Sequence, residues 1–172
     1  MLLNAAALQR ALARIAHQIA EKNEDSTKVV VVGIQKGGVH LAARLGELLA
    51  KIWNHPVPVG LLDIGLYRDD LDEKISPHIQ PTEMPFDVQN KTVVLVDDVI
   101  FSGRSTRAAL DALIDFGRPK AIQLAVLIDR GHRELPIHPD FVAKVVPTAL
   151  SERVSVNLIE IGGADTVTLE KK

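Results

Sequence analysis

The fold of the chain is decided by one stretch, Lys91-Thr-Val-Val-Leu-Val-Asp97-Asp98-Val-Ile-Phe-Ser102-Gly103-Arg104-Ser105-Thr106. Its first half is a run of β-branched and apolar residues, which is typical of a strand buried on both faces of a parallel sheet. Two adjacent acids, Asp97 and Asp98, end the run, and a short Ser/Gly loop follows them. This order of strand, acidic tip and glycine loop predicts an α/β domain whose ligand binds at the carboxyl edge of the sheet.

A helix is predicted to follow this loop, from Arg107 onward. Its apolar residues recur at helical spacing and are Leu110, Leu113 and Ile114. Gly117 and Pro119 then end the helix, in the order that is usual after a helical C-terminus.

The loop after the acids is suited to bind a phosphate group. Backbone N–H groups from Ser102 to Thr106 and the N-terminus of the following helix supply partial positive charge, and Gly103 lets the backbone approach a ligand closely. The hydroxyls of Ser102, Ser105 and Thr106 can donate further hydrogen bonds. The arrangement of strand, acids and glycine loop suits a phosphorylated sugar. Neither a Walker A loop nor a Gly-x-Gly-x-x-Gly motif occurs in the sequence.

The two acids allow more than one interpretation. At the carboxyl end of a strand, Asp97 and Asp98 can accept hydrogen bonds from ribose 2′- and 3′-hydroxyls, or hold Mg²⁺ indirectly. An Asp-Asp pair at a strand end can also serve only as a turn and a helix cap. Paired acids would further suit a receiver-like phosphoacceptor, but the phosphate loop directly after them argues against that class.

The composition is that of an ordinary globular domain. The chain has 172 residues, of which 47% are hydrophobic and 24% charged, and this predicts one domain over residues 1–172. Its net charge of −2 offers no overall attraction to nucleic acid, so any RNA surface must be a local basic patch. The chain lacks cysteine, an apolar run near the roughly 20 residues of a membrane span, and a charged signal-peptide start, so we expect a cytoplasmic protein.

Strands and helices are predicted to alternate along the chain. Helices are expected over residues 4–23 and 39–53, and strands over 28–34, 56–64, 121–128 and 141–146. Alternating residues over 151–161 and 165–169, with Gly162 and Gly163 between them, predict a C-terminal β-hairpin. We therefore expect a mostly parallel central sheet flanked by helices, with a small hood built from the chain ends and the region 63–90.

A second strand–glycine loop–helix unit contains Lys36, Gly37 and Gly38. Lysine contacts phosphate as a point charge, so the two loops together would hold both phosphorylated ends of one ligand. Glycines here can equally be the means of making a tight βα turn. The polar segment over about 68–90 has scattered apolar residues, and we expect a flexible lid that shields a reactive sugar from water.

The first predicted helix carries a basic face. Arg10, Arg14 and His17 project from the side opposite its apolar stripe of Leu8, Leu12, Ile15 and Ile19. This face is either a solvated surface or a contact for RNA phosphates or a partner subunit.

Several motifs together resemble one family over nearly the whole chain. They are Asp63-Ile-Gly-Leu-Tyr-Arg-Asp-Asp-Leu71, Val94-Leu-Val-Asp-Asp-Val-Ile-Phe-Ser-Gly-Arg104, Asp111-Ala-Leu-Ile-Asp-Phe-Gly-Arg-Pro119 and Gln123-Leu-Ala-Val-Leu-Ile-Asp-Arg-Gly-His-Arg-Glu-Leu-Pro-Ile137. The second motif resembles the phosphoribosyl pyrophosphate (PRPP) motif that all type I phosphoribosyltransferases share. The first and last resemble those of bifunctional pyrimidine-operon regulators with uracil phosphoribosyltransferase activity.

The resemblance implies a PRPP-binding core with a small hood that converts uracil and PRPP to UMP and pyrophosphate with Mg²⁺. It also implies UMP-dependent binding to the leader mRNA of pyrimidine biosynthesis genes, which attenuates transcription. We further expect a homodimer or a higher homo-oligomer.

The resemblance also assigns roles to residues, which we state as expectations. Asp97 and Asp98 would hold the ribose hydroxyls, and Ser102, Gly103, Arg104, Ser105 and Thr106 would cradle the 5′-phosphate. Lys36, Gly37 and Gly38 would contact pyrophosphate, Arg68 and Asp69 would reach its Mg²⁺, and Ile128 and Arg130 would border the base. Arg133 and His138 would join Arg10, Arg14 and His17 on the RNA surface.

Three positions depart from the family pattern. The pyrophosphate loop usually reads Thr-Arg-Gly, but here it is Lys36-Gly37-Gly38, which looks more like the loop of purine phosphoribosyltransferases. Ala13 replaces a threonine and His138 an arginine on the expected RNA surface. Two alternatives therefore stay open: an RNA-binding regulator with little turnover, and a purine-base phosphoribosyltransferase.

Overall fold

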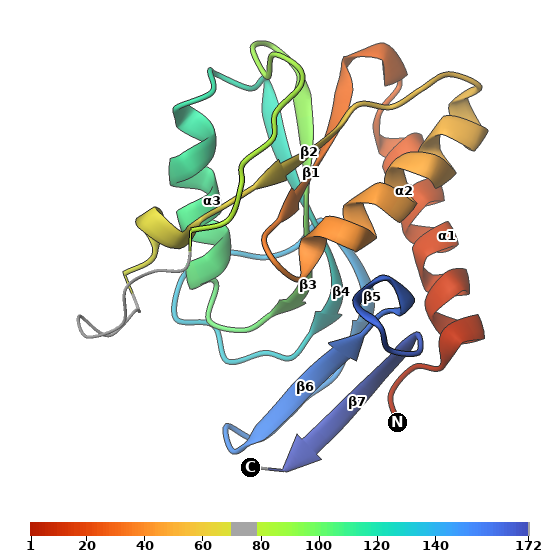
Figure 1. Ribbon diagram of the computed structural model, residues 1–172, viewed down its shortest axis with the longest axis vertical. Helices are drawn as coiled ribbons and strands as arrows, with labels where there is room; N and C mark the ends of the chain where they lie inside the picture. Colours follow the sequence, from red (N-terminus) through yellow and green to blue (C-terminus); the bar gives the residue numbers. More distant parts are fainter. Residues whose placement is uncertain (70–78, 172) are drawn as a thin grey trace.

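A computed structural model describes residues 1–69 and 79–171, and it contains a five-stranded parallel sheet (Figure 1). The strands lie in the order β2-β1-β3-β4-β5. Their bounds are Val29–Ile34 for β1, Val59–Leu62 for β2, Thr92–Ile100 for β3, Ala121–Asp129 for β4 and Phe141–Val145 for β5. Every pairing between them is parallel, as the uninterrupted apolar runs predict.

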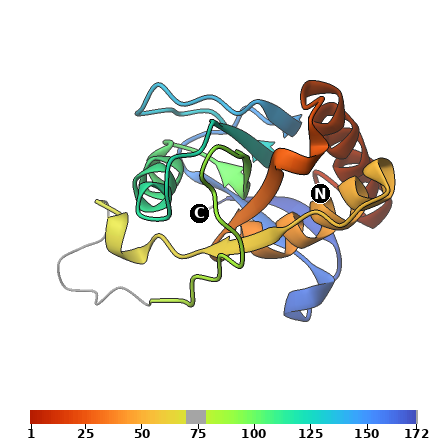
Figure 2. The same ribbon diagram turned by 90° about the horizontal axis from the view of Figure 1, so that it is seen from above.

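Three helices cover the two faces of this sheet. They are α1 (Ala5–Lys22), α2 (Gly38–Trp53) and α3 (Arg104–Ile114). Figure 2 shows α1 and α2 on one side of the sheet and α3 on the other. Alternate strand residues divide between two cores accordingly: Val94 and Val96 pack with α1 and α2, while Val93 and Leu95 pack with α3.

The first helix matches its prediction. The Asn4 side chain caps α1 by accepting a hydrogen bond from the Ala7 N–H at 2.9 Å, and Asn23 follows its last turn. The predicted stripe of Leu8, Leu12, Ile15 and Ile19 is buried. These contacts hold α1 and the sheet together through one continuous apolar core.

The third helix differs from its prediction in two respects. It begins at Arg104 rather than Arg107, because Gly103 adopts a left-handed conformation (φ +92°) that turns the chain directly from β3 into the helix. Ile114, predicted on the buried face, is 70% exposed. The buried face is formed mainly by small residues, Ala108, Ala109 and Ala112, which let α3 lie close against the sheet.

The predicted C-terminal hairpin is confirmed, with β6 at Glu152–Asn157 and β7 at Thr166–Lys171. Figure 1 shows it beyond the carboxyl ends of β3 and β4, where a hood is expected. Leu3, near the N-terminus, forms a bridge with Val167, so both chain ends contribute to this hood. Short 3-10 turns at Ser26–Lys28, Gly65–Tyr67 and Ile159–Ile161 complete the element order.

An ionic clasp joins this hood to α2. The Arg44 guanidinium contacts Glu160 at 2.7 Å and Asp165 at 2.7 and 2.8 Å. The hydrogen bonds from Arg44 hold the pKa of both carboxyls below their usual range, and the two acids raise the pKa of Arg44 in return. We call the contacts of Arg44 with Glu160 and Asp165 the Arg44 clasp.

The region 63–90 is placed differently from the hood. Residues 63–69 lie against α3, where the Tyr67 hydroxyl donates a hydrogen bond to Asp115. Residues 70–78, the centre of the expected lid, lie outside the described residues. The chain then returns along the sheet edge, where Glu83 and Leu61 exchange two hydrogen bonds of 2.8 Å, and Val88 is fully buried. The described parts of this region therefore extend the core on the α3 side.

Candidate active site

Two carboxylates lie at the carboxyl end of β3, as predicted. Asp97 is only 8% exposed, and its Oδ1 accepts a hydrogen bond from the Asp98 N–H at 2.9 Å. Asp98 is half-buried, and its Oδ1 accepts a hydrogen bond from the Val99 N–H at 2.7 Å. Each carboxylate therefore has one oxygen engaged by the backbone and another that can accept hydrogen bonds from a ligand.

Burial makes these two carboxylates unusually hard to ionise. Desolvation raises the pKa of Asp97 well above its usual range, and repulsion from Asp98 raises it further. The backbone N–H of Asp98 and the charge of Arg68 oppose this rise in part. Desolvation also raises the pKa of Asp98. A ligand that supplies hydroxyl donors or positive charge would stabilise the pair in its ionised form.

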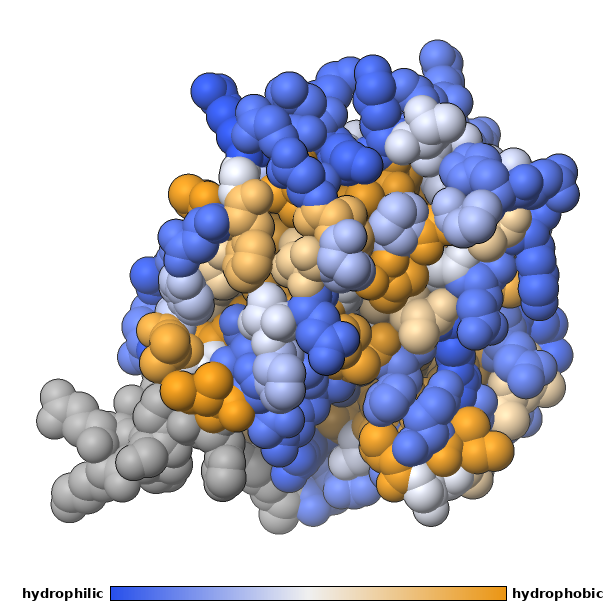
Figure 3. All heavy atoms as spheres, turned by 45° about the horizontal axis from the view of Figure 1, so that its top comes forward, coloured by the Kyte–Doolittle hydropathy of each residue, from blue (hydrophilic) through white to orange (hydrophobic). Residues whose placement is uncertain are grey.

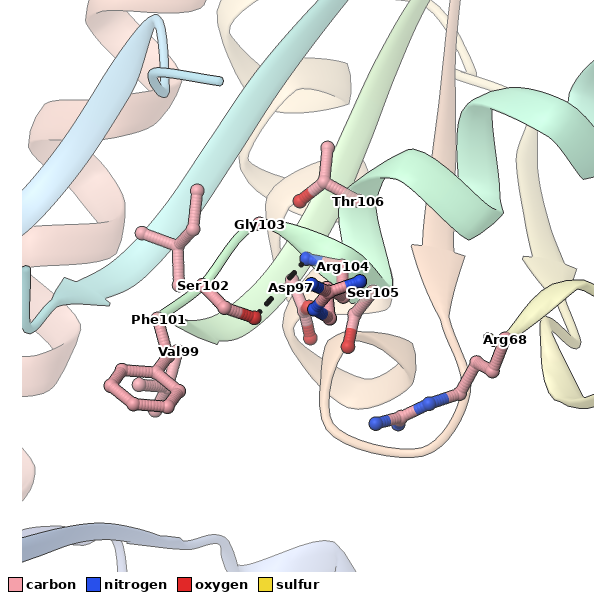
Figure 4. Close-up of a pocket in the computed structure, with 10 residues that line it drawn as sticks. Arg68, Asp97, Val99, Phe101, Ser102, Gly103, Arg104, Ser105 and Thr106 are labelled. Carbon is pink, nitrogen blue, oxygen red and sulfur yellow. Dashed lines mark hydrogen bonds between the residues drawn. The ribbon is translucent and has the colours of Figure 1, made fainter. Parts of the chain in front are cut away.

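The loop after the acids forms a small pocket of about 110 Å³. Arg68, Asp97, Phe101 and the segment from Ser102 to Thr106 line it. Ser105 and Asp97 both line the pocket, and Figure 4 shows the Ser102 hydroxyl accepting a long hydrogen bond of 3.4 Å from the Arg104 N–H. The pocket lies at the N-terminus of α3, where the first backbone N–H groups of a helix have no partner within the helix, so its chemistry suits an anion.

Thr106 contributes to the pocket differently from the two serines. Its side chain is buried, and Figure 4 shows it on the other side of the loop from Ser105 and Asp97. Thr106 also borders a second cavity, of about 240 Å³, between α3 and β4. Thr106 therefore lies between the anion pocket and the core side of the helix.

The loop between β1 and α2 packs directly on the acids. A Cβ atom added at Gly37 would collide with the carboxylate of Asp98, and one added at Gly38 would collide with the carbonyl oxygen of Val96. The Lys36 side chain is exposed beside them. The structure thus brings together two glycine loops that lie far apart in the sequence, and their glycines make the close approach possible.

Arg68 and Asp69 are placed on different partners. Arg68 lines the pocket, whereas Asp69 contacts Arg104 at 3.1 Å and also pairs with Arg107. The Arg104 Nε donates to Glu134 at 2.7 Å, and this bond raises the pKa of Arg104. Asp69 therefore faces the first turn of α3 rather than the paired acids. Local sequence pattern did not indicate Glu134 or Arg107 at this site, because the pairs join segments 30 and 38 residues apart.

Ile128 and Arg130, which were expected to border the base, do not line the pocket. The Ile128 side chain is fully buried in the core on the α1 side. Arg130 is 8% exposed, and its guanidinium carbon lies 4.3 Å from the centroid of the Phe101 ring. The pocket is also lined by Val99, Ile100 and Phe101, which the sequence did not indicate as site residues, and their place between the acids and Ser102 was the available signal.

The five residues expected on the RNA surface differ in their exposure and in their contacts. Arg10 and His17 are exposed on α1, and the Arg14 guanidinium donates to the Ala143 carbonyl. Arg133 is half-buried and donates to Asp129 and to the carbonyls of Phe101, Gly131 and Ile137. His138 is exposed and borders the cavity between α3 and β4. Arg133 therefore holds its own loop, which sequence alone did not indicate.

The fold and the PRPP-type loop together define a class of protein. Residues 1–155 match the family described as the phosphoribosyl transferase domain. The chain belongs to this phosphoribosyltransferase family. A solved hypoxanthine phosphoribosyltransferase of Trypanosoma cruzi has the same fold, with a TM-score of 0.73 at 16% identity, covering 99% of this chain and 95% of that one. A hypoxanthine-guanine phosphoribosyltransferase of Bacillus anthracis gives 0.65 at 22% identity, covering 85% and 81%.

Within this family the chain belongs with the proteins named bifunctional protein PyrR. The relative from Chloroflexus aurantiacus is 56% identical over 169 residues, which is 98% of this chain and 93% of the relative. The relative from Halalkalibacterium halodurans is 51% identical, covering 100% of this chain and 97% of its own length. The relative from Thermus thermophilus is 54% identical, covering 98% and 93%.

Proposed function

We propose that the protein transfers the ribosyl 5-phosphate group of PRPP to N1 of uracil, forming UMP and releasing pyrophosphate. The bond from C1 of the ribose to pyrophosphate breaks, a bond from C1 to N1 forms, and the N1 proton is lost to solvent. The observation that carries this proposal is the pair of desolvated acids, Asp97 and Asp98, beside the anion loop of Ser102 to Thr106. Kinship with the bifunctional PyrR proteins supports uracil as the acceptor.

Each part of the site has a role in this reaction. The loop from Ser102 to Thr106 binds the 5′-phosphate, and Asp97 and Asp98 accept hydrogen bonds from the ribose hydroxyls. Lys36, Gly37 and Gly38 border the leaving pyrophosphate, with Arg68 nearby. These groups act by positioning the substrate and by stabilising charge as the bond to pyrophosphate breaks. Asp69 acts at a distance, by holding Arg104 of the phosphate loop.

Mg²⁺ fits this site as part of the substrate complex. No group of three or more His, Cys, Asp or Glu side chains with the geometry of a metal site occurs among residues 1–69 and 79–171. Asp97 and Asp98 supply negative charge, so the remaining ligands would come from pyrophosphate and ribose oxygens and from water, as is usual for Mg²⁺. The ion, when bound, would offset the charge of the leaving pyrophosphate.

The test is conversion of radiolabelled uracil and PRPP to UMP by the purified protein, with and without Mg²⁺. A known uracil phosphoribosyltransferase in the same buffer serves as the positive control. Hypoxanthine and guanine are assayed in parallel, because Lys36-Gly37-Gly38 resembles the loop of purine enzymes. UMP formation above background supports the proposal, and a better rate with a purine base would overturn the choice of uracil.

We propose a second role as a UMP-responsive, RNA-binding attenuator of pyrimidine biosynthesis genes. The membership among bifunctional PyrR proteins and the exposed Arg10 and His17 on α1 support it. A gel shift with the leader RNA of these genes, with and without UMP, tests it. Arg10→Ala should weaken binding, whereas Lys51→Ala, at an exposed position of α2, is the matched control. Equal binding by both variants and the wild type would contradict an RNA surface on α1.

We propose that the chain forms a homo-oligomer. Figure 3 shows hydrophobic residues interspersed among hydrophilic ones on one face of the molecule. Leu66, Ile79, Ile114 and Phe116 are exposed, and Leu66, Ile79 and Phe116 line a groove of about 280 Å³ between β2 and α3. Exposed apolar residues gathered around one groove support an interface. Light scattering coupled to size-exclusion chromatography tests this, and a monomer at all concentrations would contradict it.

Among the described helices, none has the length and apolar character needed to cross a membrane.

A further inference from the structure

We propose that Phe101 is the surface on which the acceptor base stacks, and that Arg130 is a positioning residue that fixes its ring. This inference rests on the proposed function and assigns a base subsite within it. Phe101 lines the pocket next to Ser102 and is half-buried. Figure 4 shows Phe101 and Val99 together on one side of Asp97, and Arg68 on the other side.

The stereochemistry of the reaction decides which side receives the base. PRPP carries pyrophosphate on the α face of C1, and a nucleotide carries its base on the β face. Direct displacement with inversion therefore brings the base to C1 from the side opposite the leaving group. In the proposed reaction the β1–α2 loop and Arg68 border the pyrophosphate, and Figure 4 shows Arg68 on the opposite side of Asp97 from Phe101 and Val99. The base must then lie toward Val99 and Phe101.

The ring of Phe101 is held in place from behind. The guanidinium carbon of Arg130 lies 4.3 Å from the ring centroid, in a cation–π contact. The Arg130 guanidinium is fixed in turn, because it donates to Thr148 Oγ1 at 3.1 Å and to the Ala149 carbonyl at 3.0 Å. The His132 ring packs at an angle of 62° to Phe101, with centroids 5.8 Å apart. The ring is therefore preorganised before any base arrives.

This arrangement selects its ligand by shape and stacking. A planar heterocycle can stack on one face of the Phe101 ring while Arg130 covers the other face. A phenyl ring offers the base no hydrogen-bond donor or acceptor. Phe101 therefore adds affinity for any flat ring but does not distinguish bases by their polar atoms. The hydrogen-bonding groups that distinguish one base from another must come from elsewhere in the site.

The test compares Phe101→Leu with the control Phe101→Tyr, which keeps an aromatic face. Calorimetry measures the Kd for UMP and for ribose 5-phosphate, which has the same sugar and phosphate but no base. Stacking of one base is worth a factor of about 5 to 150 in affinity. We therefore expect Phe101→Leu to raise the Kd for UMP and the KM for uracil by about that factor. Its Kd for ribose 5-phosphate and KM for PRPP should stay within about twofold of the wild type, because Phe101 contacts neither the sugar nor the phosphate in this arrangement.

The possible outcomes separate this inference from the proposed function. If the wild type binds neither UMP nor ribose 5-phosphate, the proposed function fails. If the wild type binds both, and Phe101→Leu binds UMP as tightly as the wild type, the stacking surface is wrong. An equal rise in the Kd values for UMP and ribose 5-phosphate would also contradict the stacking surface, because the variant would then have disturbed the sugar or phosphate site.

The positioning role of Arg130 has its own test. Thr148→Val removes the hydroxyl that accepts from Arg130, at a position that does not line the pocket. We expect this variant, and more strongly Arg130→Met, to raise KM for uracil by about threefold or more while KM for PRPP is unchanged. A purely structural role would lower the melting temperature and leave the ratio of the two KM values as in the wild type, which would contradict positioning.

Discussion

The two strand–glycine loop–helix units, β1–α2 and β3–α3, look alike in sequence but use glycine for different reasons. In the β3–α3 loop, Gly103 has a φ of +92°, which L-residues rarely adopt. In the β1–α2 loop, Gly37 has an ordinary helical conformation, with φ −67° and ψ −34°. Gly37 and Gly38 are instead required by the lack of space against Asp98 and Val96. One loop needs backbone freedom, and the other needs a missing side chain.

The largest effect is expected from Gly38→Ala. A Cβ there would collide with the carbonyl oxygen of Val96 in the central strand, and backbone cannot move aside as a flexible side chain can. Overpacking of this kind costs about 1–3 kcal/mol or more. We expect a loss of stability near the upper end, with loss of activity. Urea denaturation measures it, and an unchanged midpoint would show that the loop relaxes away from β3.

A large effect on activity is expected from Asp97→Asn and Asp98→Asn. Each loses a charge-assisted hydrogen bond to the ribose, worth about 1.5–3 kcal/mol, so kcat/KM should fall by roughly 10- to 100-fold. The same assay on Asp111→Asn, a half-buried acid late in α3 that does not line the pocket, provides the matched control. Wild-type kinetics in both site variants would mean that the acids only cap the strand end.

The same Asp97→Asn variant should be more stable than the wild type at neutral pH. Burial raises the pKa of Asp97, so its contribution to stability is full below the unfolded value and is lost as the pH rises through the folded value. Asparagine avoids that loss, and each 1 kcal/mol recovered raises Tm by about 2–4 °C. Melting curves are measured from about pH 4 to 8, which is the range above the unfolded pKa of an aspartate. The Tm of the variant should exceed that of the wild type by an amount that grows as the pH rises. A constant difference would contradict titration of Asp97 as the cause.

A smaller effect on stability is expected from Gly37→Ala. Its Cβ would meet the Asp98 carboxylate, which is a side chain that can rotate away. We expect stability to change by about 1 kcal/mol or less, while kcat/KM falls about as far as in Asp98→Asn. The double variant Gly37→Ala/Asp98→Asn should be no worse than either single one, because both act on the same carboxylate. Additive losses would mean that Gly37 acts independently of Asp98.

An effect on stability of similar size, but with a different cause, is expected from Gly103→Ala. The space there is adequate, since the nearest atom to an added Cβ would be 3.5 Å away on Ile137. The cost comes only from the positive φ and should be about 1 kcal/mol, as for other L-residues in this conformation. Gly103→Asn should recover part of it, because asparagine tolerates the left-handed region. Equal stability of the alanine and asparagine variants would argue against conformation as the cause.

The sequence could predict features that depend on neighbouring residues. The β-branched run before Asp97, the acids and the loop from Ser102 are contiguous, so the strand, the fold class and the position of the acids at the strand end followed from local pattern. The pairing of Glu134 with Arg104 and the stacking of Arg130 on Phe101 were not predictable, because they join distant segments. Ile114 was misassigned because apolar spacing alone does not reveal that alanines form the contact face of α3.

The Arg44 clasp should make the hairpin of β6 and β7 more sensitive to acid than the rest of the molecule. Because Arg44 lowers the pKa of Glu160 and Asp165, the stability it supplies is complete above about pH 4.5, the range of unfolded carboxyls, and is lost as the pH falls through the lowered folded values. The five-stranded sheet has no comparable dependence on this pair. Acid below about pH 4 should therefore release β6 and β7 as a local unit, and hydrogen exchange would detect faster exchange there while β3 and β4 stay protected.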